Sequence, residues 1–196
     1  GPVLIDLPMN IQRSEVENPV YDMTFEDIHT DAAQAQKAAD TILEALETAK
    51  RPVIMLGHGV DSSASQRELI QFARKRQIPI ITSVLAKSVL GYEHPLNFGC
   101  IGGAYGHRYA NMIANAKSDL LLCFGISLCT RQIGTKVHEF AKGAKIIRVD
   151  IDSCNLQRDI HENGANEVKL QAETGAVIDC LSRAAVQKPD EYREWL

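Results

Sequence analysis

Residues 51–59 read RPVIMLGHG, and this stretch decides the fold. Residues 53–56 form an apolar run with no polar position at a period of two, which is typical of a strand buried on both faces of a parallel sheet. The run ends in a Gly-x-Gly turn, and Ser62 or Ser63 can cap the helix that follows. The buried face of that helix is expected to use Leu69, Ile70 and Ala73. The stretch therefore predicts one strand–turn–helix unit of an α/β sheet.

Four further apolar runs repeat this pattern along the chain. Strands are predicted at residues 78–82, 119–124, 145–150 and 168–170. A long glycine-rich connection, residues 83–105, separates the second strand from the third. Strand and helix alternate at βαβ spacing over residues 52–186, which predicts an α/β fold with a parallel sheet, helices on both faces and right-handed crossovers.

Helices are predicted wherever apolar residues recur three or four positions apart. The first begins at Asp31, an N-cap residue, with Gln34 placed to complete a capping arrangement. The later helices are marked by Tyr109, Met112, Ile113 and Ala116, by Ile133, Val137 and Phe140, and by Val177, Leu181 and Ala184.

The composition is that of one ordinary globular domain. The chain has 196 residues, 45% of them apolar, which suffices for a fully developed core. The net charge is −4 and no long Lys/Arg run occurs, so no nucleic-acid partner is expected. The longest apolar stretch, residues 120–129, is too short to cross a bilayer. The five cysteines have irregular spacings, which predicts neither a disulfide framework nor a zinc site and favours a reducing cytoplasm.

The candidate site lies after the strands, because ligands of an open α/β sheet bind beyond the carboxyl ends of its strands. The residues concerned are 57–59, Thr82 and Ser83, 125–127, and 150–152. Glycine at three of these positions allows backbone to approach a phosphate, and the helix N-termini that follow favour anions. The same glycines also suit tight strand-to-helix turns, so both interpretations stay open. Asp150 and Asp152 are interpreted as one turn former and one ribose binder rather than as an acid–base pair.

Other functional classes lack their motifs. A third glycine of the dinucleotide fingerprint is replaced by Ser62, and the second strand ends in Thr82 and Ser83 rather than in an acidic residue, so a dehydrogenase is disfavoured. The sequence has no G-x-S-x-G elbow, no Walker A motif and no C-x-x-C pair. The histidines without a partner at metal-ligand spacing, expected to be structural or surface residues, are His58, His107, His138 and His161.

The order of these segments resembles that of acetolactate-synthase-like enzymes, a branch of the thiamine-diphosphate-dependent family. Residues 1–12, GPVLIDLPMNIQ, resemble the G-P-V-x-I-D-x-P-x-D-x-Q stretch that closes the family's pyrimidine-binding domain, with Asn10 where Asp is usual. Residues 51–59 resemble the R-P-V-x-x-x-G-x-G start of its central domain. Further likenesses lie at residues 78–91, 102–111, 119–125 and 146–152.

This resemblance implies the non-catalytic central domain of a thiamine-diphosphate-dependent 2-keto-acid decarboxylase or carboligase. The implied layout is the last strand of a pyrimidine-binding domain (1–12), a linker (13–30), the central domain (31–186) and a linker to a diphosphate-binding domain (187–196). The implied fold is a Rossmann-like, doubly wound, about six-stranded, mostly parallel sheet of the DHS-like NAD/FAD-binding type. The implied partners are the two flanking domains of the same chain, in a cytoplasmic homodimer or homotetramer.

The same resemblance bears on cofactors. The family's catalytic glutamate and its G-D-G…N motif have no copy in this sequence, so thiamine diphosphate and magnesium are expected to bind outside it and the chain alone is expected to be an inactive part of a transferase or lyase. Central domains of relatives bind FAD, ADP or a CoA moiety, or nothing. An FAD or ADP would contact Gly57, His58, Gly59, Thr82, Ser83, Gly125, Asp150 and Asp152.

One departure from the family pattern concerns the flavin. Residues 125–134 resemble the G-A-R-F-D-D-R-x-T-G motif and match it at Arg131 and Gly134, but Ser127 replaces its first arginine. Serine cannot replace arginine as an anion and stacking partner. We therefore expect the chain not to retain a flavin on purification.

An alternative interpretation is a free-standing nucleotide- or flavin-binding module of the same fold, related to electron-transfer flavoproteins or sirtuins. The missing zinc cysteines disfavour a sirtuin. The short apolar run at residues 3–5, expected to be a strand separated from its sheet, disfavours a self-contained module. For the parent enzyme, acetolactate synthesis is the leading hypothesis, beside glyoxylate carboligase, sulfoacetaldehyde acetyltransferase and oxalyl-CoA or benzoylformate decarboxylase reactions.

Overall fold

A six-stranded sheet forms the centre of the computed structural model, which describes residues 4–15, 30–61, 64–103, 105–185 and 192–196. The strands are β1 (Pro52–Leu56), β2 (Ile80–Thr82), β3 (Asn97–Cys100), β4 (Leu120–Phe124), β5 (Lys145–Asp150) and β6 (Glu167–Gln171). They lie in the order β3-β2-β1-β4-β5-β6, and all neighbouring pairs are parallel. The order changes direction between β1 and β4. The predicted doubly wound α/β class is thus confirmed, with its switch point at these two strands.

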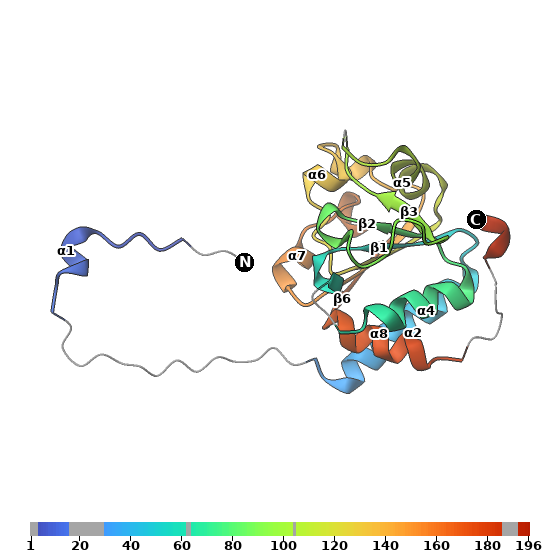
Figure 1. The fold of residues 1–196 in the computed structure, drawn as a ribbon, viewed down its shortest axis with the longest axis horizontal. Coiled ribbons are helices and arrows are strands. Elements are labelled where there is room, and N and C mark those ends of the chain that lie inside the picture. The colour runs from blue at the N-terminus through green and yellow to red at the C-terminus, as the bar shows by residue number, and fades with distance from the viewer. Residues whose placement is uncertain (1–3, 16–29, 62–63, 104, 186–191) are drawn as a thin grey trace.

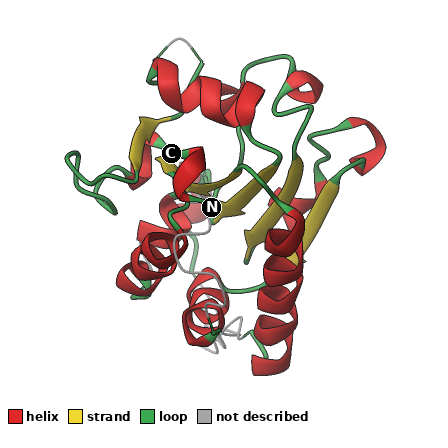
Figure 2. Cartoon of the chain, turned by 90° about the vertical axis from the view of Figure 1, so that its right-hand side faces the viewer, coloured by secondary structure: helices red, strands yellow, loops and turns green. Residues whose placement is uncertain are grey.

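Helices cover both faces of the sheet (Figures 1 and 2). On one face lie α2 (Ala32–Thr48), α4 (Gln66–Arg76) and α8 (Thr174–Arg183), and on the other α5 (Arg108–Met112) and α6 (Thr130–Ile133). The short helices α3 (His58–Asp61) and α7 (Ser153–Gln157) follow β1 and β5 at the carboxyl edge of the sheet. In the described part of the chain, no helix has the length and apolar character needed to span a membrane.

The core consists of two apolar layers, because successive residues of a strand point to opposite faces of the sheet. In β1, Ile54 and Leu56 pack in the layer under α2, α4 and α8. Val53 and Met55 pack in the layer under α5 and α6. All residues of β1 are buried, so the unbroken apolar run of the sequence follows from a strand that is covered on both faces.

The sequence did not predict β3, which lies inside the expected long connection. Its residues, NFGC, include one glycine with a φ of 97° and are mostly half-buried, so they form no apolar run. β3 is an edge strand, and among the described strands it pairs with β2 alone. An edge strand needs less apolar character than a central one, which explains why the apolar pattern missed it.

Two predicted helices differ from the structure. The helix expected through Ile133, Val137 and Phe140 stops at Ile133, because Gly134 takes a φ of 86° and ends α6 after one turn. In the helix expected from Tyr109 to Ala116, Tyr109 is 68% exposed, and the buried positions include Ala110. α5 continues there as a π-helix at Ile113–Lys117, and this change of helical period shifts the buried face.

The capping prediction for α2 is half confirmed. Asp31 is the N-cap and accepts a hydrogen bond from Ala33 N at 3.3 Å. Gln34 does not complete the capping arrangement, because its side chain donates to Gln171 O at the end of β6 instead. The predicted caps Ser62 and Ser63 lie outside the described residues.

The two ends of the chain differ in how they pack. Residues 4–8 form no strand with this sheet, and α1 (Met9–Gln12) has no buried residue, so their assignment to the last strand of a pyrimidine-binding domain stays a prediction. A strand requires a neighbour to satisfy its backbone, and no strand in the described part of the chain pairs with this segment (Figure 1). At the other end, the buried Tyr192 donates through its hydroxyl to Leu46 O at 2.7 Å. Part of the segment expected as a carboxyl-terminal linker therefore packs on the domain.

Candidate functional site

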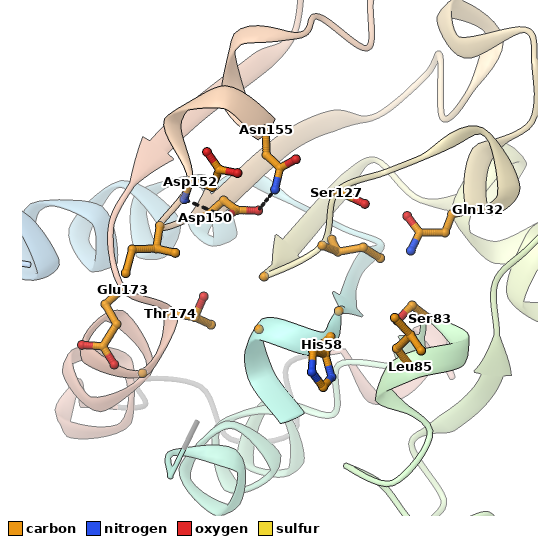
Figure 3. A pocket seen from close by; sticks show the side chains of 16 residues that line it. His58, Ser83, Leu85, Ser127, Gln132, Asp150, Asp152, Asn155, Glu173 and Thr174 are labelled. Carbon is orange, nitrogen blue, oxygen red and sulfur yellow. Dashed lines mark hydrogen bonds between the residues drawn. The ribbon is translucent and has the colours of Figure 1, made fainter. Parts of the chain in front are cut away.

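A cavity of about 490 Å³ opens at the carboxyl edge of the sheet, above the switch point between β1 and β4. Its lining comes from the segments that follow β1, β2, β4, β5 and β6, and Figure 3 shows their side chains around one space. The lining residues are Gly57, His58, Gly59, Ser83, Leu85, Gly125, Ile126, Ser127, Gln132, Asp150, Ile151, Asp152, Asn155, Glu173, Thr174 and Gly175. The location agrees with the rule for open α/β sheets.

The glycines of the cavity hold two loops against each other. A Cβ atom at Gly57 would lie 2.0 Å from Gly125 O, and one at Gly59 would lie 2.8 Å from Gly125 Cα. Gly125 itself has a φ of 55°, where L side chains are strained. The backbone bonds Gly57 N to Phe124 O (2.9 Å) and Gly59 N to Gly125 O (3.1 Å) join the loops after β1 and β4. This close backbone contact accounts for all three glycines without a ligand.

The acidic wall of the cavity is organised by backbone hydrogen bonds. Asp150 is 7% exposed and accepts from Asp152 N at 2.9 Å and from the Asn155 side chain at 3.4 Å (Figure 3). Asp152 is the N-cap of α7 and accepts from Cys154 N at 2.8 Å. Both aspartates therefore stabilise the turn between β5 and α7. The ribose-binding role assigned to one of them stays a prediction.

Two arginines fix the loops behind this wall. The side chain of Arg148, in the middle of β5, is 2% exposed and donates to the carbonyl oxygens of Arg158 (2.7 Å) and Asn155. The guanidinium of Arg158 in turn donates to Ser127 O (2.8 Å) and Leu128 O (2.5 Å). The segment after β5 is thereby tied both to the sheet and to the loop after β4.

Glu167 completes the anchor from the neighbouring strand β6. Its Oε2 lies 3.7 Å from Arg148 Nη1, with the two side chains 1% and 2% exposed. Its Oε1 accepts the backbone amides of Ile160 (2.6 Å) and His161 (2.5 Å). The buried ion pair thus holds residues 155–161 from both sides. A further pair links Lys169 of the same strand to Asp159, and that hydrogen bond lowers the pKa of Asp159 below its usual value.

The structure brings all but one of the predicted binding residues to this cavity. Thr82 does not line it, since it is 3% exposed at the end of β2. Sequence reasoning missed Gln132, Asn155 and Glu173. Glu173 follows β6, so the strand-end rule applied to that predicted strand would have identified it. The other two lie within helices and carry no such signal.

The histidines serve structural roles where their bonds are known. His107 Nδ1 accepts from Cys100 N at 2.8 Å, and His138 Nδ1 lies 2.9 Å from Ile160 O. His161 is 6% exposed, with its two ring nitrogens near Ala165 O and Phe140 O. No group of three or more His, Cys, Asp or Glu side chains within the described ranges is placed to hold a metal ion.

A second, apolar cavity of about 530 Å³ adjoins the first. The two share Ser83, Leu85 and Gln132 in their linings. Its further lining includes Ile101 and Tyr105, from the glycine-rich segment around β3, and the side chain of Tyr105 is largely exposed. The two cavities form one continuous concave edge, acidic over β5 and β6 and apolar beside β2.

Comparison with known proteins identifies relatives over most of the chain. Residues 39–181 match the model of the family described as "Thiamine pyrophosphate enzyme, central domain". The chain is 38% identical over 166 residues to the acetolactate synthase isozyme 1 large subunit of Escherichia coli K12, which covers 80% of the chain and 27% of the relative. It is 31% identical over 166 residues to the glyoxylate carboligase of Escherichia coli O157:H7, covering 81% of the chain and 26% of the relative.

A plant relative aligns over the whole chain. The probable chloroplastic acetolactate synthase 2 of rice (Oryza sativa subsp. japonica) is 31% identical over 202 residues, covering 100% of the chain and 30% of the relative. The chain thus spans less than a third of the length of each of these three relatives.

Proposed function

Because this chain belongs to the thiamine pyrophosphate enzyme family, as a central domain, we propose that it is the scaffold domain of a 2-keto-acid decarboxylase or carboligase. Relatives named acetolactate synthase and glyoxylate carboligase support this class of reaction. Acetolactate synthesis is the specific reaction that we favour, since the E. coli isozyme 1 subunit is 38% identical.

The observation that carries the proposal is the structural use of the polar groups at the carboxyl edge. The glycines pack backbone against backbone, and both aspartates hold the turn before α7. Such an edge maintains the shape of the domain rather than presenting an acid–base pair to a substrate. The chemistry of the family resides in its cofactor, and the protein supplies binding and orientation for it elsewhere in the polypeptide.

The apolar cavity suggests how the domain contributes to the proposed enzyme. Leu85, just after β2, and Tyr105, after β3, are 68% and 93% exposed. We assign the connection from Leu85 to Tyr105 to one wall of the route by which substrate reaches the cofactor. Apolar surface of this kind is usual where one domain faces another or a ligand.

The proposed partners are a pyrimidine-binding and a diphosphate-binding domain of the same polypeptide, within a homodimer or homotetramer. Thiamine diphosphate and magnesium would bind to those domains, and no residue of this chain is assigned to them. The five cysteines are free, which supports a reducing compartment such as the cytoplasm.

A complementation assay tests this proposal. The chain alone and the chain joined to the flanking domains of the E. coli isozyme 1 large subunit are compared for thiamine-diphosphate-dependent and Mg²⁺-dependent release of CO₂ from pyruvate. We expect no turnover by the chain alone and measurable turnover by the joined protein. Turnover by the chain alone would overturn the scaffold assignment.

A further inference from the structure

The fold and the family resemblance both point to a nucleotide in the cavity at the carboxyl edge, and FAD and ADP share a diphosphate group that must find donors there. A diphosphate is bound by backbone N–H groups at strand and helix ends and by arginine or lysine side chains. The cavity therefore fits a diphosphate only if it offers unbonded backbone N–H groups and arginine or lysine side chains.

Four backbone donors at the strand ends are already bonded within the protein. Gly57 N and Gly125 N donate to Phe124 O and Val149 O, each at 2.9 Å. Ser83 N donates to Leu56 O at 2.8 Å, and Asp152 N donates to the carboxylate of Asp150 at 2.9 Å. A diphosphate would have to break these bonds, including those that join the two glycine loops.

The charge of the lining is also of the wrong sign. No lysine or arginine is among the described residues that line the cavity, whereas three carboxylates, Asp150, Asp152 and Glu173, are. Arg158, which does not line the cavity, donates its hydrogen bonds to the carbonyl oxygens of Ser127 and Leu128. A diphosphate held in this cavity would thus meet like charges and no described lysine or arginine of its lining, since Arg131 lines the adjoining apolar cavity.

A further group of donors lies at the N-terminus of α8. The helix begins after Glu173, whose carbonyl oxygen accepts from Val177 N, so the amides of Thr174 and Gly175 have no acceptor within the helix. Both residues line the cavity. The N-cap residue Glu173 is itself acidic, so a carboxylate stands where an anion would bind.

We infer that this cavity excludes nucleotides that carry a diphosphate, because four of its strand-end amides are bonded within the protein and its lining is acidic. This inference goes beyond the proposed scaffold function, which would hold for a domain with or without a bound nucleotide. It also bears on the replacement of the family arginine by Ser127, since no described lysine or arginine lines this cavity in its place and Arg131 lines the adjoining one.

Calorimetric titration with ADP, together with gel filtration of the chain mixed with FAD, tests the inference. The variants are Glu173→Gln and the double variant Ser127→Arg/Glu173→Gln, with Glu47→Arg as the control. That control adds the same positive charge as the double variant, at an exposed position near the end of α2, which leads into the start of β1 and so lies away from the carboxyl edge. Far-UV circular dichroism confirms that each variant is folded.

We expect no saturable ADP binding by the wild-type chain up to about 1 mM and no flavin absorbance carried through gel filtration. The double variant should bind ADP at least about tenfold more tightly than Glu47→Arg, with Glu173→Gln in between. Saturable binding of ADP or FAD by the wild-type chain would overturn the inference. A double variant no better than the charge control would overturn the part of the inference that assigns the exclusion to the lining charge.

Discussion

Replacing Arg148 with methionine would test whether the buried ion pair between β5 and β6 holds the segment after β5 in place. Methionine keeps most of the length of the side chain but removes its charge and its donors. The variant leaves the carboxylate of Glu167 buried without a cation, and it leaves the carbonyl oxygens of Asn155 and Arg158 without their donor.

The expected loss is large because both partners are almost fully buried. At 3.7 Å, the attraction between the two charges amounts to about 4 to 5 kcal/mol at an effective dielectric constant of about 20. Breaking one side of a buried pair typically costs about 3 to 5 kcal/mol. We expect Arg148→Met to lower the free energy of unfolding by that amount. Glu167→Gln leaves Arg148 without an anion, but Arg148 keeps its two carbonyl acceptors and the amide oxygen can still accept the two backbone N–H groups, so we expect a smaller loss of about 1 to 3 kcal/mol.

Urea unfolding followed by the fluorescence of Trp195 and by circular dichroism provides the measurement. The double variant Arg148→Met/Glu167→Gln should lose less than the sum of the single losses, with a coupling energy of about 1 to 3 kcal/mol. The control is Lys142→Met, which removes an exposed ion pair with Glu139 and should cost at most about 1 kcal/mol. A loss under about 1 kcal/mol for Arg148→Met, or strict additivity in the cycle, would refute the reasoning.

Three further predictions concern single positions. Gly57→Ala would place a Cβ 2.0 Å from a backbone oxygen and should cost about 3 kcal/mol or more of unfolding free energy, whereas Gly91→Ala, with nothing within 4 Å, should change it by less than about 0.5 kcal/mol. Equal unfolding midpoints for the two would contradict the packing account. Burial raises the pKa of the Cys123 thiol to about 12, so a thiol reagent near pH 8 should label exposed Cys154 in the native state and Cys123 only after unfolding, as mass spectrometry of digests would show. The pKa of Asp159 is lowered by its lysine partner, so the ionised carboxylate stabilises the fold above about pH 4 and loses this effect as the pH falls through the folded-state pKa. Melting temperatures of wild type and Asp159→Asn should therefore differ at neutral pH and converge in acid, and a constant difference would speak against this ion pair.

The parts of the fold that the sequence predicts are those in which local pattern and burial coincide. β1 is covered on both faces, so its apolar run is unambiguous. β3 is a short edge strand containing Gly99, and only its pairing with β2 makes it a strand. α6 ends at Gly134, although apolar residues continue at helical spacing beyond it, because a positive φ overrides the pattern.

In the candidate site, too, the positions of residues could be predicted from local pattern, whereas their tertiary contacts could not. Gly57, Gly125 and Asp150 could be predicted because the strand-end rule depends only on where strands stop. The use of their amides could not be predicted, since the bonds between the loops depend on how β1 and β4 are placed side by side. Arg148 is the clearest omission. A charged residue within an apolar strand marks a buried pair, but its partner, Glu167, lies on another strand and only the fold brings the two together.

The most direct test of the central claim is to read the gene on both sides of the segment that encodes these 196 residues. The account predicts an open reading frame that continues in both directions, with a glutamate-bearing pyrimidine-binding domain upstream and a G-D-G…N motif downstream. Stop codons at both edges, or unrelated neighbouring domains, would contradict the assignment of this chain as the scaffold of a thiamine-diphosphate-dependent enzyme.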